Sequence, residues 1–201
     1  SFLTFFALLH IPMIENLKIA CVIPCYKETN HILDVLKKIP DIVDYIFVVD
    51  DNCPKKTGEL VLEKNEDLRV NVIFLEKNLG VGGATVAGYK EAIKYNADIV
   101  VKIDGDGQMN PLNLKKVITP IVSKKCDYAK GNRFFYVNDI KSMPKGRIFG
   151  NICLTFLSKF SSGFWEISDP TNGYTAIHQT ALRSLDLDRI SAGYFFESDV
   201  L

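Results

Sequence analysis

The 201-residue sequence lacks any apolar stretch long enough to cross a bilayer, and its formal net charge is zero. The first absence argues against a chain that spans a membrane. The second removes bulk electrostatic attraction to nucleic acid or to another strongly charged partner. With 47% hydrophobic and 24% charged residues, the composition is that of a globular protein, and the length fits one domain or most of one.

Common cysteine and phosphate motifs are missing as well. Five cysteines and three histidines are scattered, and no CxxC spacing occurs. A zinc site is therefore not indicated. The odd number of cysteines and the lack of CxxC predict reduced thiols and thus a cytosolic compartment. The chain also lacks GxxxxGK[ST], which excludes a phosphate loop of that type.

The two ends of the chain differ from its middle. Residues 1–12 are apolar but short and have no basic residue ahead of them, so they make a poor signal peptide. We expect residues 1–12 to lie upstream of the folded unit and a domain to run from 13 to 201. The sequence ends at FFESDVL without Gly, Pro or a polar tail, so we expect a C-terminal truncation inside an element.

The middle of the chain alternates strand and helix patterns. Strands are predicted at 18–23, 45–49, 70–75, 99–103 and 128–134, and helices at 32–39, 57–65 and 111–124. A glycine-rich loop is predicted at 76–84, and it leads into a further helix that ends near residue 95. This alternation requires crossover connections, so we predict an α/β domain with a mostly parallel sheet and helices on both faces. Residues 148–164 favour a helix whose wide apolar face suits core packing or a membrane surface. A short strand is expected at 175–177.

The most informative stretch is VVKIDGDGQMNP, residues 100–111. A buried strand ends at Asp104 and Asp106, and a helix start follows, with Asn110 as a candidate N-cap and Pro111 at the first helical position. Ligands of α/β proteins bind at the carboxyl ends of strands. Two carboxylates there predict a divalent cation shared with nucleotide phosphates. An ordinary surface turn rich in Asp and Gly is the alternative.

Several segments, in this order, resemble the inverting family 2 glycosyltransferases of the GT-A fold. They are VIPCYKE (22–28), VVDD (48–51), NLGVGGA (78–84), DGD (104–106), GNRF (131–134) and DPTNGYTAI (169–177). The resemblance covers the chain from about Lys18 to its end. It is nearest to the branch of dolichol-phosphate mannosyltransferase and related polyprenyl-phosphate glycosyltransferases. FFESD near the end resembles instead the acidic motif of members with sugar acceptors, which leaves the acceptor open.

The resemblance implies metal-assisted transfer of a sugar from GDP-mannose or a UDP-sugar to a polyprenyl phosphate or a glycan. It implies Mg²⁺ or Mn²⁺ as the cofactor, synthesis of cell envelope or glycans as the setting, and peripheral contact with the cytoplasmic face of a membrane. Two alternatives remain. One is an inactive relic that binds a nucleotide sugar. The other is a dinucleotide-binding oxidoreductase that uses Gly80 and Gly82, with Thr85 where a third glycine belongs.

The resemblance also assigns roles to single residues. It assigns the cation to Asp104, Asp106 and Gln108. It assigns the donor to Pro24, Tyr26, Glu28, Asp51, Gly80, Asp104 and Arg133. It assigns the acceptor to Arg147, Thr171 and Asn172, with Lys145 beside Arg147 for an acceptor phosphate. A hydroxyl acceptor needs a general base, for which the candidates are Asp199 and then Glu197.

Structural explanations of these residues stay open. Glu28 and Arg133 can be plain surface residues. The terminal acids suit the first turn of a helix, where carboxylates are favoured. A turn explains Thr171 and Asn172 as well as ligand binding does. An acceptor phosphate is already an anion and needs no base.

Overall fold

The computed structural model of the chain describes residues 16–131, 172–191, 193, 196 and 200. These residues form a six-stranded sheet with strand order β3-β2-β1-β4-β6-β5. The strands are β1 (Ile19–Cys25), β2 (Tyr45–Asp50), β3 (Val70–Phe74), β4 (Ile99–Lys102), β5 (Tyr128–Lys130) and β6 (Thr175–His178). The helices are α2 (Ile32–Leu36), α3 (Thr57–Lys64), α4 (Gly80–Lys94), the 3₁₀ turn η1 (Pro111–Asn113), α5 (Leu114–Val122) and α8 (Gln179–Ser184).

The sheet is parallel except at one strand. β1 pairs in parallel with β2 and β4, and β2 with β3. β6 is antiparallel to both β4 and β5. Four parallel strands, β1 to β4, therefore end at one edge of the sheet, which we call the carboxyl edge, and β6 begins there. The opposite edge is the amino edge.

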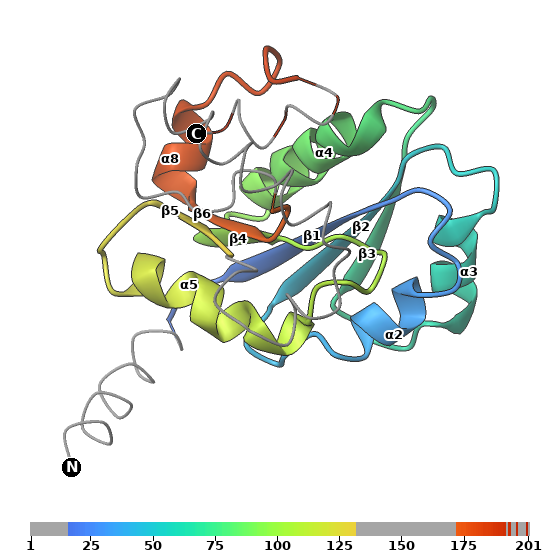
Figure 1. Ribbon diagram of the computed structural model, residues 1–201, viewed down its shortest axis with the longest axis horizontal. Helices are drawn as coiled ribbons and strands as arrows, with labels where there is room; N and C mark the ends of the chain where they lie inside the picture. Colours follow the sequence, from blue (N-terminus) through green and yellow to red (C-terminus); the bar gives the residue numbers. More distant parts are fainter. Residues whose placement is uncertain (1–15, 132–171, 192, 194–195, 197–199, 201) are drawn as a thin grey trace, which may run out of the picture.

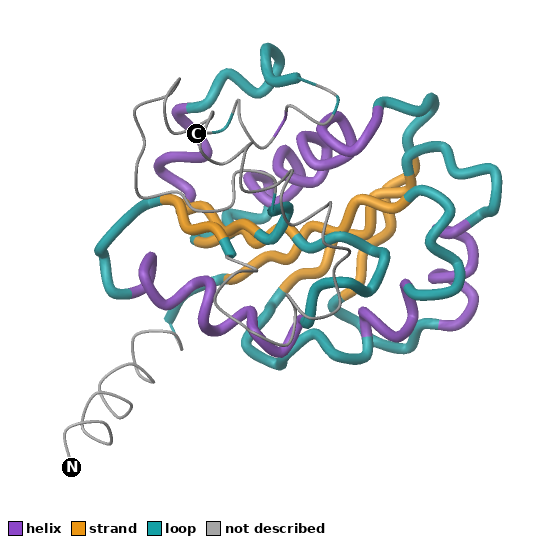
Figure 2. The backbone as a smooth tube through the Cα atoms, viewed as in Figure 1, coloured by secondary structure: helices purple, strands orange, loops and turns teal. Residues whose placement is uncertain are grey.

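Helices cover both faces of the sheet. Figure 1 shows α4 and α8 on one face and α2, α3 and α5 on the other, and Figure 2 shows the strands as the middle layer. All seven residues of β1 are buried, because this strand lies in the centre of the sheet under both helical layers. That burial explains its continuous apolar run. The predicted α/β class, with a mostly parallel sheet and helices on both faces, is confirmed.

Most of the predicted elements are present with small shifts at their ends. The largest shift is that of α4, which begins at Gly80, inside the stretch predicted as a glycine-rich loop. The side chain of Asn110 accepts a hydrogen bond from the backbone N–H of Leu112 at 3.1 Å, which confirms the predicted N-cap. Helix α8 was not predicted. Among the helices that the structure describes, none is long and apolar enough to span a membrane. The predicted helix at 148–164 and the predicted domain start at Met13 lie outside the described residues.

Candidate active site at the carboxyl edge of the sheet

Loops from neighbouring strands meet at the carboxyl edge. The loop after β1 is tied to the loop after β2, because the backbone N–H of Lys27 donates to the sulfur of Cys53 at 3.0 Å. The loop after β2 is tied in turn to the loop after β3, because Asp51 accepts from the N–H of Gly80 at 2.9 Å. The polar residues that follow separate strands are therefore brought together.

Asp50 fixes the loop after β2 from within. Its carboxylate accepts hydrogen bonds from the backbone N–H groups of Cys53 at 2.7 Å and Gly58 at 2.6 Å. Only 2% of Asp50 is exposed. Two amide donors offset the cost of burying this charge. Asp50 therefore holds the start of α3 in place.

Asp51 holds the glycine-rich loop. Its two carboxylate oxygens accept from the N–H groups of Leu79 at 2.6 Å and Gly80 at 2.9 Å. Asp51 and Gly80, both predicted to bind the donor, thus contact each other. A phosphate loop works through backbone N–H groups that point at the ligand. Here two such groups already point at Asp51, so the geometry does not support the oxidoreductase alternative.

Asp104 and Asp106 lie in the loop that follows β4. Asp104 Oδ1 is 2.7 Å from Nζ of Lys102, and 30% of the Asp104 side chain is exposed. Asp106 Oδ1 accepts from the backbone N–H of Gln108 at 2.9 Å. Asp106 is half-buried and Gln108 is exposed. The three residues predicted to bind a cation therefore lie in one short loop that is open to solvent.

Glu28 belongs to the same cluster of charge. Burial raises the pKa of its carboxyl above the ordinary 4.5, and the negative charges of Asp106 and Asp104 raise it further, against the lowering effect of His31. Glu28 is thus near enough to Asp104 and Asp106 to be repelled by both. Glu28 was assigned to the donor and the two aspartates mainly to the cation, and the structure unites them in one acidic cluster.

This cluster fits a cation that arrives with a phosphate ligand. Among the described residues, no three His, Cys, Asp or Glu side chains are placed to hold a metal ion by themselves. Mg²⁺ is usually held by one or two carboxylates together with substrate phosphates and water. The hard oxygen atoms of Asp104 and Asp106 suit Mg²⁺ or Mn²⁺. A cation at Asp104 and Asp106 would offset the negative charge that repels the carboxylate of Glu28.

Cys53 is a site residue that the sequence analysis missed. It supports the loop after β1, where Lys27 has a φ of 67°, an uncommon value for a residue other than glycine. The hydroxyl of Thr57 lies 3.1 Å from the same sulfur. Burial alone raises the pKa of the Cys53 thiol, but hydrogen bonds from Thr57, Lys27 and Lys55 together lower it. The only feature of the sequence that could have identified Cys53 as a site residue is its position three residues after Asp50.

Asn172 joins two distant parts of the chain. Its Nδ2 donates to the carbonyl of Gly131 at 2.7 Å, and its Oδ1 accepts from the N–H of Tyr174 at 3.1 Å. The N–H of Gly131 donates to the carbonyl of Tyr174 at 2.7 Å. We call these three bonds the 131–172 clamp. They give the buried Asn172 a structural role, and its predicted contact with an acceptor stays a prediction.

The other predicted residues divide into two groups. Pro24 is buried in β1, whereas 41% of Tyr26 is exposed and Nζ of Lys27 lies 4.8 Å from the centre of its ring. Six predicted residues lie outside the described part of the chain: Arg133, Lys145, Arg147, Thr171, Glu197 and Asp199.

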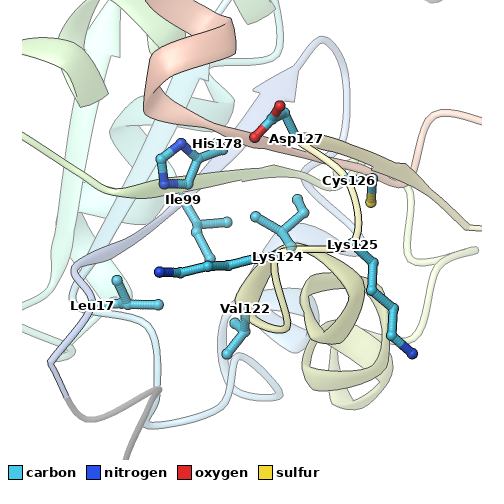
Figure 3. Close-up of a pocket in the computed structure, with 9 residues that line it drawn as sticks. Leu17, Ile99, Val122, Lys124, Lys125, Cys126, Asp127 and His178 are labelled. Carbon is cyan, nitrogen blue, oxygen red and sulfur yellow. The ribbon is translucent and has the colours of Figure 1, made fainter.

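A separate pocket of about 340 Å³ lies at the amino edge. Figure 3 shows it between the start of β1, the end of α5 and His178. Leu17, Lys124, Asp127 and His178 are among its lining residues. None of the predicted site residues that the structure describes is among the residues that line it.

Comparisons of sequence match the chain to a known family. A family model described as "Glycosyl transferase family 2" matches residues 20–186. A UDP-N-acetylglucosamine–dolichyl-phosphate N-acetylglucosaminyltransferase of Methanococcus voltae is 33% identical over 178 residues, which cover 82% of this chain and 70% of that protein. An undecaprenyl-phosphate mannosyltransferase of Micrococcus luteus is 28% identical over 188 residues, which cover 92% of this chain and 76% of that protein.

A comparison of structures supports the fold. Glucosyl-3-phosphoglycerate synthase from Mycobacterium tuberculosis, crystallised with Mn²⁺, UDP and glucosyl-3-phosphoglycerate, matches with a TM-score of 0.69 and 20% sequence identity. The match covers 94% of this chain but only 65% of that protein. This likeness bears on the fold alone, and it agrees with the predicted GT-A arrangement.

Proposed function

Because this chain belongs to glycosyl transferase family 2, we propose that it transfers a sugar from a nucleoside-diphosphate sugar to a polyprenyl phosphate. The family is the one that the sequence motifs predicted. Relatives named for transfer to dolichyl phosphate and undecaprenyl phosphate support this acceptor over a glycan. The observation that carries the proposal is the acidic cluster of Glu28, Asp104 and Asp106, which lies at the same edge of the sheet as the loop that Asp51 holds.

The donor nucleotide is proposed to lie over the loops after β1, β2 and β3. The exposed ring of Tyr26 offers a face for stacking of the base, and Pro24 and Glu28 flank it in sequence. Asp51 and Gly80 border the same region through their mutual hydrogen bond. Arg133 is proposed to donate to the diphosphate. The donor is GDP-mannose or a UDP-sugar.

The diphosphate is proposed to lie over the acidic cluster. Asp104, Asp106 and Gln108 would hold Mg²⁺ or Mn²⁺, which supplies Lewis-acid neutralisation of the charge that builds on the leaving diphosphate. The loop keeps Asp106 oriented, because its Oδ1 accepts from the N–H of Gln108. Asp104 is oriented by Lys102.

The transfer itself is proposed to proceed with inversion. An oxygen of the acceptor phosphate attacks the anomeric carbon while the bond from that carbon to the diphosphate oxygen breaks. The nucleoside diphosphate departs with the electron pair. A phosphate nucleophile is already anionic, so no base is required. Arg147, Thr171 and Asn172 are proposed to bind the acceptor, with Lys145 beside Arg147.

For a glycan acceptor the proposal changes in one step. Asp199, or failing that Glu197, would remove the proton of the attacking hydroxyl. With a lipid phosphate as the acceptor, the protein is proposed to act at the cytoplasmic face of a membrane, through peripheral contact. The folded unit is proposed to run from residue 13 to 201.

The first test is nucleotide binding by calorimetry. The 201-residue chain is titrated with GDP and with UDP, each with and without Mn²⁺. We expect one nucleotide to bind in a way that needs both Mn²⁺ and Asp106, so Asp106→Ala abolishes the binding. Asp188→Ala is the matched control, because this exposed carboxylate pairs with Lys90 far from the cluster. Binding of neither nucleotide to the folded chain would contradict the proposal.

The second test is transfer. The chain is given labelled GDP-mannose or UDP-sugars and either a short polyprenyl phosphate or a glycan. We expect labelled lipid phosphate to form. If only the glycan becomes labelled, the acceptor is a glycan and not a polyprenyl phosphate. Nucleotide binding without transfer to any acceptor would favour the inactive relic.

A further inference from the structure

Lys102 is an unexpected residue at the end of a buried strand. Only 1% of it is exposed. Its backbone pairs with Val22 of β1 and with Thr175 of β6. Paired residues on neighbouring strands face the same side, and Val22 belongs to the apolar core under α4. An ammonium group in such surroundings is costly unless a charged partner is supplied.

Asp104 supplies that partner, at 2.7 Å from Nζ of Lys102. Gly173 closes over the pair, since a Cβ at this position would lie 2.6 Å from both Asp104 Oδ2 and Lys102 Nζ. A side chain at this position would displace one or both ends of the pair, so glycine allows the backbone to lie directly against it. The ammonium is therefore held against one of the carboxylates that the proposed function gives to the cation.

We propose that Lys102 is a positioning residue that weakens divalent-cation binding until a nucleotide diphosphate is present. This inference rests on the proposed function. A cation bound by Asp104 lies near the fixed positive charge of Lys102, and the two positive charges repel. A diphosphate adds negative charge on the other side of the cation and offsets this repulsion. The cation and the nucleotide therefore bind as a coupled pair.

Coupling of this kind is reciprocal. The factor by which a nucleotide tightens Mn²⁺ binding equals the factor by which Mn²⁺ tightens nucleotide binding. Removing the charge of Lys102 should strengthen Mn²⁺ binding most in the nucleotide-free protein. It should thereby reduce the coupling factor. A residue with a purely structural role would instead weaken Mn²⁺ binding when it is changed, because Asp104 would lose its orientation.

The experiment measures free Mn²⁺ by its electron paramagnetic resonance signal. The 201-residue chain is titrated without nucleotide, with GDP and with UDP. For Lys102→Met, which removes the charge but keeps the length, we expect the nucleotide-free Kd for Mn²⁺ to fall at least about fivefold. Lys102→Gln is measured as a second uncharged variant, and circular dichroism verifies that each variant is folded.

Two controls keep the charge or move the change elsewhere. Lys102→Arg retains the positive charge and should keep the weak nucleotide-free affinity. Lys90→Met removes a lysine that pairs with Asp188 at 2.6 Å on the exposed surface, and it should leave the Kd unchanged. The proposal is overturned if the nucleotide-free Kd for Mn²⁺ falls by less than this, or rises, in both uncharged variants. It is also overturned if Lys102→Arg lowers this Kd as much as Lys102→Met does.

Failure of the proposed function is distinguished by Asp106→Ala. If this variant leaves Mn²⁺ binding unaltered in the presence of GDP and UDP, the cation site itself is wrong. If Asp106→Ala abolishes binding while Lys102→Met does not tighten it, only the role of Lys102 is wrong.

Discussion

Two acidic pairs lie at the carboxyl ends of β2 and β4, the strands on either side of β1, and their contacts differ. Asp50 is the last residue of β2 and Asp51 follows it, and both are buried and accept hydrogen bonds from backbone N–H groups. Asp104 and Asp106 follow β4, are partly exposed, and share a region of negative charge with Glu28. Four backbone N–H groups offset the charge of the first pair, whereas the second pair has one, that of Gln108, together with the ammonium of Lys102.

The difference separates structural from functional acids. A carboxylate surrounded by amide donors stabilises the loop that provides them. A carboxylate held near other carboxylates costs free energy in the absence of a ligand. Such a cost is typical of a functional site. Substitutions in the two acidic pairs, which look alike in sequence, should therefore have opposite effects: loss of stability for the first pair and loss of activity for the second. Four substitutions test this contrast.

The largest effect is expected for Asp106→Asn. Removing this charge should lower the rate of sugar transfer by about 100-fold to 1000-fold, because a cation on the leaving diphosphate loses a ligand. The free energy of unfolding should change by less than about 0.5 kcal/mol, since Asp106 is half-buried and repels Glu28. Product formation from labelled donor and urea unfolding give the two numbers. A large loss of stability would place Asp106 with the structural pair.

Asp50→Ala should show the reverse pattern. Two buried N–H groups, those of Cys53 and Gly58, would lose their acceptor. We expect a loss of about 3 kcal/mol in the free energy of unfolding, measured by urea denaturation. The Mn²⁺ affinity of the folded fraction should change less than about threefold. Lost cation binding with stability retained would show that Asp50 belongs to the functional pair.

How much of this contrast the sequence reveals depends on the range of the contacts. The position of β1 and the placement of Asp104 after the buried strand β4 follow from short apolar runs and were predicted. The partners of Asp51 come from 28 and 29 residues further along the chain, and no local pattern names them. Lys102 was likewise overlooked, because its burial depends on β1 and β6 on either side.

Other parts were hidden for different physical reasons. The reversed direction of β6 depends on pairing with β4 and β5, so it could not be deduced from its four residues. Helix α8 spans only six residues, too few for a periodic apolar pattern. Arg133 and the terminal acids lie outside the described residues, so their roles stay predictions.

Asp51→Asn should have an intermediate effect. Asparagine keeps one oxygen acceptor but directs an NH₂ group at an N–H donor of residue 79 or 80. We expect a loss of about 1–2 kcal/mol in the free energy of unfolding, measured by urea denaturation. Nucleotide affinity, measured by calorimetry, should fall with it if the glycine-rich loop borders the donor. An unchanged stability with lost affinity would make Asp51 a direct ligand only.

The smallest effect is expected for Glu28→Gln, and it depends on pH. Burial and then the charges of Asp106 and Asp104 raise the pKa of this carboxyl in the folded protein above its ordinary 4.5. Folding therefore favours the protonated form, and the stability contributed by Glu28 is present below pH 4.5 and is lost as pH rises through the folded pKa.

Near neutral pH the Glu28→Gln variant should be slightly more stable than the natural chain, and this advantage should disappear in acid. Urea unfolding at pH 4 and pH 7 measures the difference. Equal stabilities at both values would mean that Glu28 is well solvated and separate from the acidic cluster. Glu63→Gln, on the exposed side of α3, is the matched control.

The 131–172 clamp has a consequence for how such a protein can diversify. Its hydrogen bonds hold residues 131 and 172 side by side, so the span between them departs from and returns to one point at the carboxyl edge. The entropic cost of closing a loop rises only slowly as the loop becomes longer. Segments of different length can therefore be exchanged at this point while β5 and β6 stay paired. The clamp therefore allows the segment between residues 131 and 172 to vary, and substrate specificity with it, while the packing of the sheet is retained.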